Sequence, residues 1–186
     1  MINDEKCISK AKCKLRGLEQ KDAPRMLEWM YDSGINQWYK YPFAEMTLEK
    51  TEKFIQSAND SECIRHYAIV NDEDEYCGTI SLKNIDYENL CAEMAIVLRR
   101  EYHGTGIAKE AALLLFEKAF DELSLHKVYL NVLSDNERAI SFYKKIGMKE
   151  EGISKEAVKI QGIFRDLTWF GILDKEYRGT DERFCY

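Results

Sequence analysis

The order of apolar and polar positions along the chain predicts alternating strands and helices. Apolar residues at helical spacing predict four helices, one beginning at Asp22 and the others covering Thr47–Ala58, Lys109–Phe120 and Asn136–Met148. Strand-like runs stand at Lys12–Leu18, His66–Val70, Tyr76–Leu82, Cys91–Leu98, Lys127–Leu133, Gly152–Val158 and Gly162–Leu173. The aromatic-rich segment Gly34–Phe43 is expected to be a loop. This order of elements predicts a mixed α/β sheet.

A two-glycine turn connects one strand-like run to the third predicted helix. Residues 101–109 read Glu-Tyr-His-Gly-Thr-Gly-Ile-Ala-Lys and follow the apolar run Ala95-Ile-Val-Leu98. Glycine lets backbone N–H groups approach a ligand closely. The start of a helix adds unpaired N–H groups and a partial positive charge. The turn at Gly104 and Gly106 therefore suits an anion such as a pyrophosphate, although a Gly-x-Gly sequence alone is more typical of an ordinary tight turn.

The fourth predicted helix has recognisable ends. Asn136 has the residue type of an N-cap, and Gly147 that of a C-terminal cap. Tyr143 lies seven residues after Asn136, two turns along the same helix face. By itself the segment reads as an amphipathic helix in which Tyr143 packs half-buried.

Together, the two segments resemble the pattern of the GNAT superfamily of acetyl-CoA-dependent N-acetyltransferases. That pattern runs strand, Gln/Arg-x-x-Gly-x-Gly/Ala, helix, strand, then Asn-x-x-Ala-x-x-x-Tyr-x-x-x-Gly-Phe. The chain matches it at Gly104, Gly106, Asn136, Ala139, Tyr143 and Gly147. It departs at Glu101, where Gln or Arg is usual, and at Met148, where Phe is usual. Glu101 would put an acid near the expected pyrophosphate.

The resemblance covers nearly the whole chain. Ala92-Glu93, Lys109-Glu110-Ala111 and Arg165-Asp166 look like the RimJ/RimL-type branch, and polyamine N-acetyltransferases are similar across the same core. The resemblance implies one α/β domain over residues 12–178, with a central, mostly antiparallel, twisted sheet flanked by about four helices. Residues 1–11 would be an N-terminal extension and residues 179–186 a C-terminal tail.

Composition narrows the classes of partner. The 186 residues are 45% hydrophobic and 32% charged, as in an ordinary globular domain, and carry a net charge of −6. An acidic chain is a poor partner for nucleic acid or an anionic membrane, and suits a cationic amine. The N-terminus does not resemble a signal peptide and no apolar stretch approaches membrane-spanning length, so a cytoplasmic location is expected.

The six cysteines do not form a metal-binding pattern. They are Cys7, Cys13, Cys63, Cys77, Cys91 and Cys185, with no Cys-x-x-Cys pair. No metal is therefore expected. Cys63, Cys77 and Cys91 stand in or beside strand-like runs, and we expect all three to be buried thiols.

Acetyl-CoA is the co-substrate that the resemblance implies. In the family, the strand carrying Ile96, Val97 and Leu98 splays from the next one, the pantetheine arm lies in the gap, and a strand N–H can bind the thioester oxygen. The other expected cofactor contacts are His103, Gly104, Thr105, Gly106, Ile107, Ala108, Lys109, Asn136, Ala139, Phe142 and Lys145. His103 is expected to contribute its backbone N–H.

Tyr143 is the predicted general acid. A departing thiolate must gain a proton, and a phenol of ordinary pKa near 10 can supply it. Glu93 is the predicted base, because a cationic amine must lose a proton before it attacks; alternatively, it is a solvent-facing charge at the strand edge. Glu28 and Glu45 are weaker candidates for the base.

Trp38, Tyr39 and Tyr41 are the predicted acceptor-site residues. They could stack on a sugar or hold an ammonium by cation–π attraction; a packed aromatic loop is the alternative. The polyamine branch carries acids here, whereas this chain has Tyr39-Lys40-Tyr41, which argues against a polyamine.

The sequence therefore predicts transfer of an acetyl group from acetyl-CoA to a primary amine by direct attack. The sequence shows no Ser/His/Asp arrangement, and no histidine stands near Cys91. An acyl-enzyme intermediate is therefore not expected. The alternative is a non-catalytic acyl-CoA-binding or regulatory domain of the same fold. Acceptors left open are an amino sugar or other small amine, a polyamine and a protein N-terminus. A homodimer is also left open.

Overall fold

A computed structural model describes residues 13–39, 41, 43–58 and 60–179, so the predicted extension 1–11 and all but Gly179 of the predicted tail lie outside it. The strands are β1 (Lys14–Gly17), β2 (Arg65–Val70), β3 (Tyr76–Asp86), β4 (Cys91–Leu98), β5 (Lys127–Leu133), β6 (Lys149–Ile160) and β7 (Ile163–Leu173). The α-helices are α1 (Ala23–Tyr31), α2 (Ser33–Asn36), α3 (Leu48–Ser57), α4 (Ile107–Glu117), α5 (Glu137–Lys145) and α6 (Asp174–Arg178).

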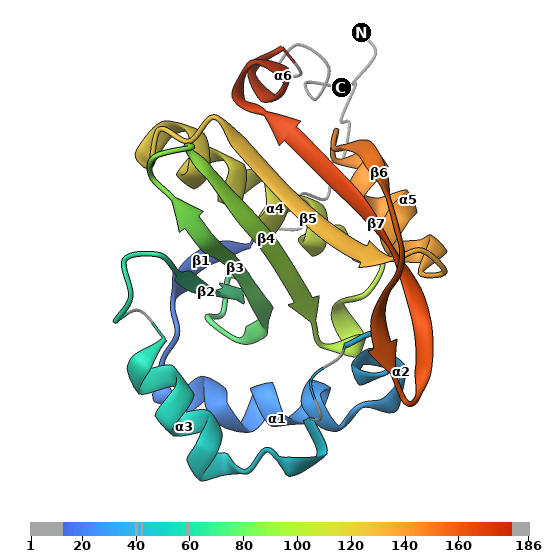
Figure 1. Ribbon diagram of the computed structural model, residues 1–186. Helices are drawn as coiled ribbons and strands as arrows, with labels where there is room; N and C mark the ends of the chain where they lie inside the picture. Colours follow the sequence, from blue (N-terminus) through green and yellow to red (C-terminus); the bar gives the residue numbers. More distant parts are fainter. Residues whose placement is uncertain (1–12, 40, 42, 59, 180–186) are drawn as a thin grey trace, which may run out of the picture.

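The seven strands form one sheet in the order β1-β2-β3-β4-β5-β7-β6. Every neighbouring pair is antiparallel except β4 and β5. That parallel pair is joined only where Cys91–Glu93 meet Lys127–Tyr129. Beyond it the two strands diverge, as Figure 1 shows. Residues 94–98 of β4 consequently have no strand partner on the β5 side among the described residues. The mixed, mostly antiparallel sheet is thus confirmed.

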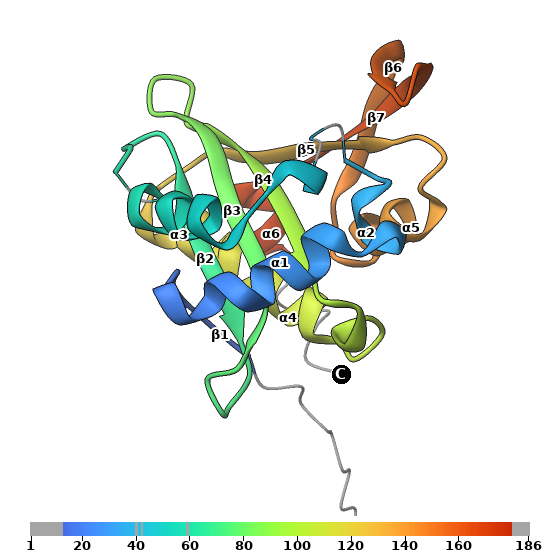
Figure 2. The ribbon, with the colours of Figure 1, turned by 90° about the horizontal axis from the view of Figure 1, so that it is seen from below.

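Alternation along the strands divides the core between the two faces of the sheet. Ile80 and Leu82 face the cluster that contains Phe116 of α4 and Tyr143 of α5. On the opposite face, Ala68 and Val70 join a second cluster with α1 and α3, through Met26, Trp29, Met30 and Ile55. Figure 1 shows α4 behind the sheet, and Figure 2 shows α1 and α3 in front of β2, β3 and β4.

The four predicted helices are α1, α3, α4 and α5, and two short helices were not predicted. The expected loop Gly34–Phe43 was partly wrong, because it begins inside α2, which Asp32 caps by accepting a hydrogen bond from the Gly34 N–H at 2.8 Å. One helical turn is too short to show a periodicity. Strand β6 extends beyond its predicted bounds at both ends, whereas β7 begins one residue later than predicted. The two strands meet at Gln161-Gly162, where positive φ angles make the tight turn of a hairpin.

The expectation that Cys63, Cys77 and Cys91 are all buried was wrong for two of them. Cys77 is buried, whereas Cys63 is exposed and Cys91 is half-buried. Cys63 lies in the turn before β2 and Cys91 is the first residue of β4, so neither is deep in the sheet. In the part of the chain that is described, no three His, Cys, Asp or Glu side chains are grouped to hold a metal. None of the described helices is long and apolar enough to cross a membrane.

A buried arginine follows β4. Arg99 is 5% exposed, and its guanidinium contacts Glu28 of α1 at 2.7 Å, Glu75 at 3.2 Å and Glu101 at 2.5 Å. It also donates to the Tyr76 carbonyl at 3.1 Å. Because these partners come from distant segments, Arg99 connects α1 and the start of β3 to the turn that leads into α4.

Replacing Arg99 with Met should therefore destabilise the fold by about 2 kcal/mol, since three carboxylates lose a cation and a buried carbonyl loses its donor. Arg25→Met is the matched control. Arg25 contacts two of the same carboxylates, Glu28 and Glu75, from an exposed position, and its loss should cost no more than about 0.5 kcal/mol. Urea unfolding measures both, and equal losses would contradict the role given to Arg99.

Candidate functional site

The turn before α4 presents unpaired backbone donors. Gly104 and Gly106 have φ angles of 82° and 94°, in the left-handed region that glycine adopts at little cost, and Gly106 is the N-cap of α4. Among the described residues, no acceptor is found for the backbone N–H groups of Gly104, Thr105 and Gly106. These donors stand at a helix N-terminus, where an anion is favoured.

Other side chains hold this turn in place. The Thr105 hydroxyl donates to the Tyr102 carbonyl at 2.8 Å, and the Ile107 N–H reaches the same hydroxyl at 3.4 Å. The backbone N–H of His103 donates to the Arg100 carbonyl at 3.1 Å. The expectation that this N–H is offered to a ligand is therefore not met here. The His103 imidazole instead lies 3.1 Å from the Leu98 carbonyl and 3.2 Å from Arg138.

Two arginines that the sequence analysis missed stand beside the turn. A hollow of about 200 Å³ is lined by Gly34, Ile35, Arg100, His103 and Arg138. Arg138 comes from the first turn of α5, and Arg100 forms an ion pair with Asp32, with Nε to Oδ2 at 2.7 Å. Arg138 could have been noticed, because it lies two residues after Asn136.

The carboxylate of Glu101 does not add a free negative charge to the turn. It pairs with the buried Arg99 at 2.5 Å. The acid at this position is therefore partly offset by Arg99, a cation that Glu101 shares with Glu28 and Glu75.

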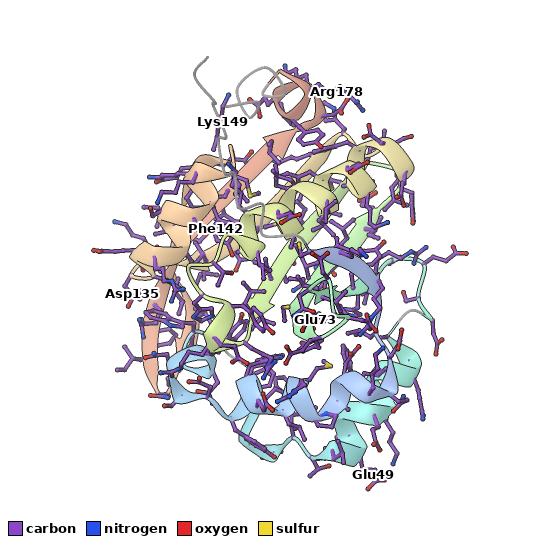
Figure 3. The ribbon with its side chains drawn as sticks, turned by 180° about the vertical axis from the view of Figure 1, so that it is seen from behind. Glu49, Glu73, Asp135, Phe142, Lys149 and Arg178 are labelled. Atoms are coloured by element: carbon purple, nitrogen blue, oxygen red, sulfur yellow. The ribbon has the colours of Figure 1, made fainter. Side chains whose placement is uncertain are left out.

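Helix α5 is capped as predicted and brings Tyr143 into the core. The Asn136 side chain accepts from the Ala139 N–H at 3.2 Å, and Gly147 follows the helix with a φ of 91°. Phe142, labelled in Figure 3, is half-buried and its ring lies 5.3 Å from that of Tyr143. The remaining predicted cofactor residues on the helices differ in exposure: Ile107 is buried, Ala108 and Ala139 are half-buried, and Lys109 and Lys145 are exposed.

Tyr143 and Tyr39 lie near each other, although they belong to the clusters on opposite faces of the sheet. Burial raises the pKa of Tyr143 well above its ordinary value, and the nearby Tyr39 raises it further. Burial also raises the pKa of Tyr39 to about 12. The Tyr39 hydroxyl donates to the Ile96 carbonyl at 3.3 Å. No acceptor for the Tyr143 hydroxyl is found within the described ranges. Both phenols therefore stay protonated at neutral pH, and that of Tyr143 is available to donate.

A pocket of about 600 Å³ lies between α1, α3 and the face of β2, β3 and β4. Its aromatic wall includes Tyr39, Tyr41 and Phe43, whose neighbouring rings lie 5.2 to 5.7 Å apart. Of the predicted acceptor residues, Tyr39 and Tyr41 line the pocket, and Trp38 is half-buried outside its lining. The pocket reaches Ala95, Ile96 and Val97 of β4. These residues belong to the segment that has parted from β5, so the pocket and the gap between the strands share one stretch of backbone.

Glu93 is engaged by its neighbours. Its carboxylate lies 3.2 Å from the Lys83 ammonium and accepts from the Asn84 amide at 2.9 Å. Its side chain is on the pocket face of β4, two residues before Ala95, but is not part of the pocket lining. The weaker candidates lie elsewhere: Glu28 pairs with Arg25 and Arg99, and Glu45 is exposed.

His66 was not predicted and lies in the pocket lining. Its Nδ1 is 2.7 Å from the Ser81 hydroxyl. Burial lowers the pKa of His66 below its ordinary value, and the nearby Lys83 ammonium lowers it further. The imidazole is thus neutral at pH 7. The alternation of His66, Ala68 and Val70 along one strand could have placed it on an inward face.

The lowered pKa of His66 predicts a loss of stability on acidification. In the unfolded chain the imidazole binds a proton near pH 6.5, whereas the folded state resists protonation. The stabilising contribution is therefore present above about pH 6.5 and is lost as the pH falls through the folded-state pKa. His66→Gln should flatten this part of the curve of unfolding free energy against pH, measured in urea from about pH 5 to 8. His126→Gln, at an exposed position, is the control, and an unaltered curve for His66→Gln would refute the assignment.

Comparison with known proteins agrees with this geometry. Residues 12–149 match the family described as acetyltransferase (GNAT) domain. The spermidine N(1)-acetyltransferase of Escherichia coli (strain K12) is 30% identical over 165 residues, covering 88% of this chain and 87% of that protein. A putative ribosomal N-acetyltransferase of Bacillus subtilis (strain 168) is 28% identical over 174 residues, covering 89% of this chain and 93% of that protein.

Among solved structures, the spermidine N-acetyltransferase from Vibrio cholerae in complex with CoA and spermine is similar in fold. The TM-score is 0.81 at 26% sequence identity, over 89% of this chain and 98% of that one. The family match covers well over half of the chain, and the structural match covers 89% of it. The chain therefore belongs to the GNAT family of acetyltransferases and is an N-acetyltransferase by class.

Proposed function

We propose that this enzyme transfers an acetyl group from acetyl-CoA to the nitrogen of a primary amine, by direct attack. The observation that carries the proposal is the shared segment Ala95–Val97. It borders the apolar pocket on one side and the parting of β4 from β5 on the other. An amine in the pocket and a thioester in the gap would meet there, and proximity of this kind supplies much of a rate enhancement.

The residues around the gap suit a CoA molecule. The unpaired N–H groups at 104–106 and the cations of Arg100 and Arg138 would hold its phosphates. The unpaired edge of β4 at 94–98 would hydrogen-bond its amide-containing arm. When bound, acetyl-CoA supplies the acetyl thioester.

Tyr143 is proposed as the general acid. In the transfer, a bond forms between the amine nitrogen and the acetyl carbon, and the bond from that carbon to sulfur breaks. The sulfur takes the phenolic proton of Tyr143, and the amine nitrogen loses one proton. The raised pKa keeps this phenol protonated. The same burial would raise the pKa of a departing thiol, so the two remain comparable in basicity.

The proton lost by the amine has two candidate acceptors. Glu93 remains a candidate through water, although both of its oxygens already accept hydrogen bonds. His66 is the second candidate, because it is neutral and lines the pocket.

The proposal predicts that Gly106→Glu abolishes CoA binding while the fold persists. At a φ of 94° the larger residue is strained, and its carboxylate would stand among the donors meant for phosphate. Saturating acetyl-CoA should raise the melting temperature of the parent by mass action but not that of the variant, and circular dichroism should be native in both. A variant that is stabilised as much as the parent would show that the phosphates bind elsewhere.

Tyr143→Phe should lower kcat by at least about tenfold, with the affinity for acetyl-CoA nearly unchanged, because only a proton donor is removed. Release of CoA thiol with an amine panel measures the rate. Tyr39→Phe is the matched control, since it removes a hydroxyl that donates to a carbonyl, and it should lose less. An unchanged kcat for Tyr143→Phe, where chemistry limits the rate, would remove Tyr143 from the mechanism. Binding of acetyl-CoA without thiol release for any amine would instead indicate a non-catalytic acyl-CoA-binding domain.

A further inference from the structure

The charged residues that line the apolar pocket are all basic. Lys50 and Lys53 come from α3 and Lys83 from β3, and no Asp or Glu belongs to the lining in the part of the chain that the structure describes. The other polar residues of the lining are uncharged hydroxyls and the neutral His66. The pocket of an acidic protein with a net charge of −6 is thus locally positive.

Nearby carboxylates neutralise these lysines unequally. Lys53 pairs with Glu49 at 2.6 Å, but both side chains are at least 70% exposed, and Glu49 points outward from α3 in Figure 3. Lys83 pairs with Glu93 at 3.2 Å. Lys50 donates to the backbone carbonyl of Glu45 at 2.8 Å, and no carboxylate pairs with it among the described residues. Lys50 is therefore the cation best placed to receive an anion from a ligand.

The register of β3 against β4 sets how far Lys83 lies along the strands from the transfer point. Thr79, Ser81 and Lys83 lie on the same face of β3, opposite Val97, Ala95 and Glu93 of β4. Lys83 is two residues, or about 7 Å, beyond Ser81, which lies opposite Ala95. The rest of the lining is mostly apolar and includes Met26, Trp29, Met30, Tyr39, Tyr41, Phe43, Met46 and Phe54.

We propose that the acceptor is a primary amine with an apolar body, about the length of one aromatic ring, and an anionic group at its far end. This inference rests on the proposed function and specifies its substrate class. The amine nitrogen lies toward Ala95–Val97, the body against the aromatic wall, and the anion among Lys50, Lys53 and Lys83. Charge-assisted hydrogen bonds favour that anion. A polyamine would have to place a second ammonium beside these lysines, and like charges in an interface are costly.

Three amines test the inference. 4-(2-aminoethyl)benzoate and phenethylamine differ only in the carboxylate at the far end, and spermidine is an aliphatic polyamine that carries further ammonium groups. Calorimetry with the full-length protein, with and without CoA, measures their dissociation constants, and thiol release measures their turnover. The benzoate should bind at least about tenfold more tightly than phenethylamine, as expected for one charge-assisted contact. Spermidine should bind most weakly. Equal or tighter binding of spermidine, an absent effect of the carboxylate, or binding of none of the three would overturn the inference.

Variants of Lys50 test whether this residue causes the preference for an anionic acceptor. Lys50→Met should remove most of the preference for the benzoate over phenethylamine, and Lys50→Glu should shift the preference toward spermidine. Lys149→Met is the control, because Lys149 is exposed at the beginning of β6, far from α3 in Figure 3. A Lys50→Glu variant that keeps the parent's preference would overturn the inference.

The two proposals can fail separately. Tight binding of the benzoate without thiol release would support the charge preference and count against acetyl transfer. Thiol release that is fastest with spermidine would support acetyl transfer and overturn the preference for an anionic acceptor.

Discussion

The parting of β4 from β5 is the constraint on which the candidate site depends. A parallel pair that stays together saturates its backbone groups, whereas here only Cys91–Glu93 and Lys127–Tyr129 are joined. The rest of β4 has an edge that is not paired with β5. The backbone N–H and C=O groups of such an edge can hydrogen-bond to another molecule. The fold thereby creates a slot that another extended, amide-containing molecule can occupy.

Elements on both sides of the gap contribute groups to the candidate site. Arg99 holds the turn after β4 by bonding to Glu28, Glu75 and Glu101. The turn then supplies unpaired N–H groups at the start of α4, while α5 supplies Tyr143. Stability and the candidate chemistry are therefore coupled, because the same ion cluster that connects α1 to β3 positions the anion-binding turn.

The acceptor that we propose from the pocket differs from the acceptors in the names of the relatives. The relatives in Escherichia coli and Vibrio cholerae are named as spermidine acetyltransferases, at 30% and 26% identity. Such identity is enough to preserve a sheet and a glycine turn. In contrast, the acceptor that we propose rests on the few charges that line one cavity, which in the described part of this chain are Lys50, Lys53 and Lys83.

The sequence by itself determined the features that depend on neighbouring residues. The glycine turn, the Asn136 cap and the helix carrying Tyr143 are local patterns, and each was found where it was predicted. Only the tertiary structure decided which distant side chains meet. The Arg99–Glu28 contact joins residues 71 positions apart, and the lysines of the pocket come from a helix and a strand whose pairing no periodicity encodes. Helical and strand periods report which face of an element is buried, but the choice of partner for that face is made by packing of the whole chain.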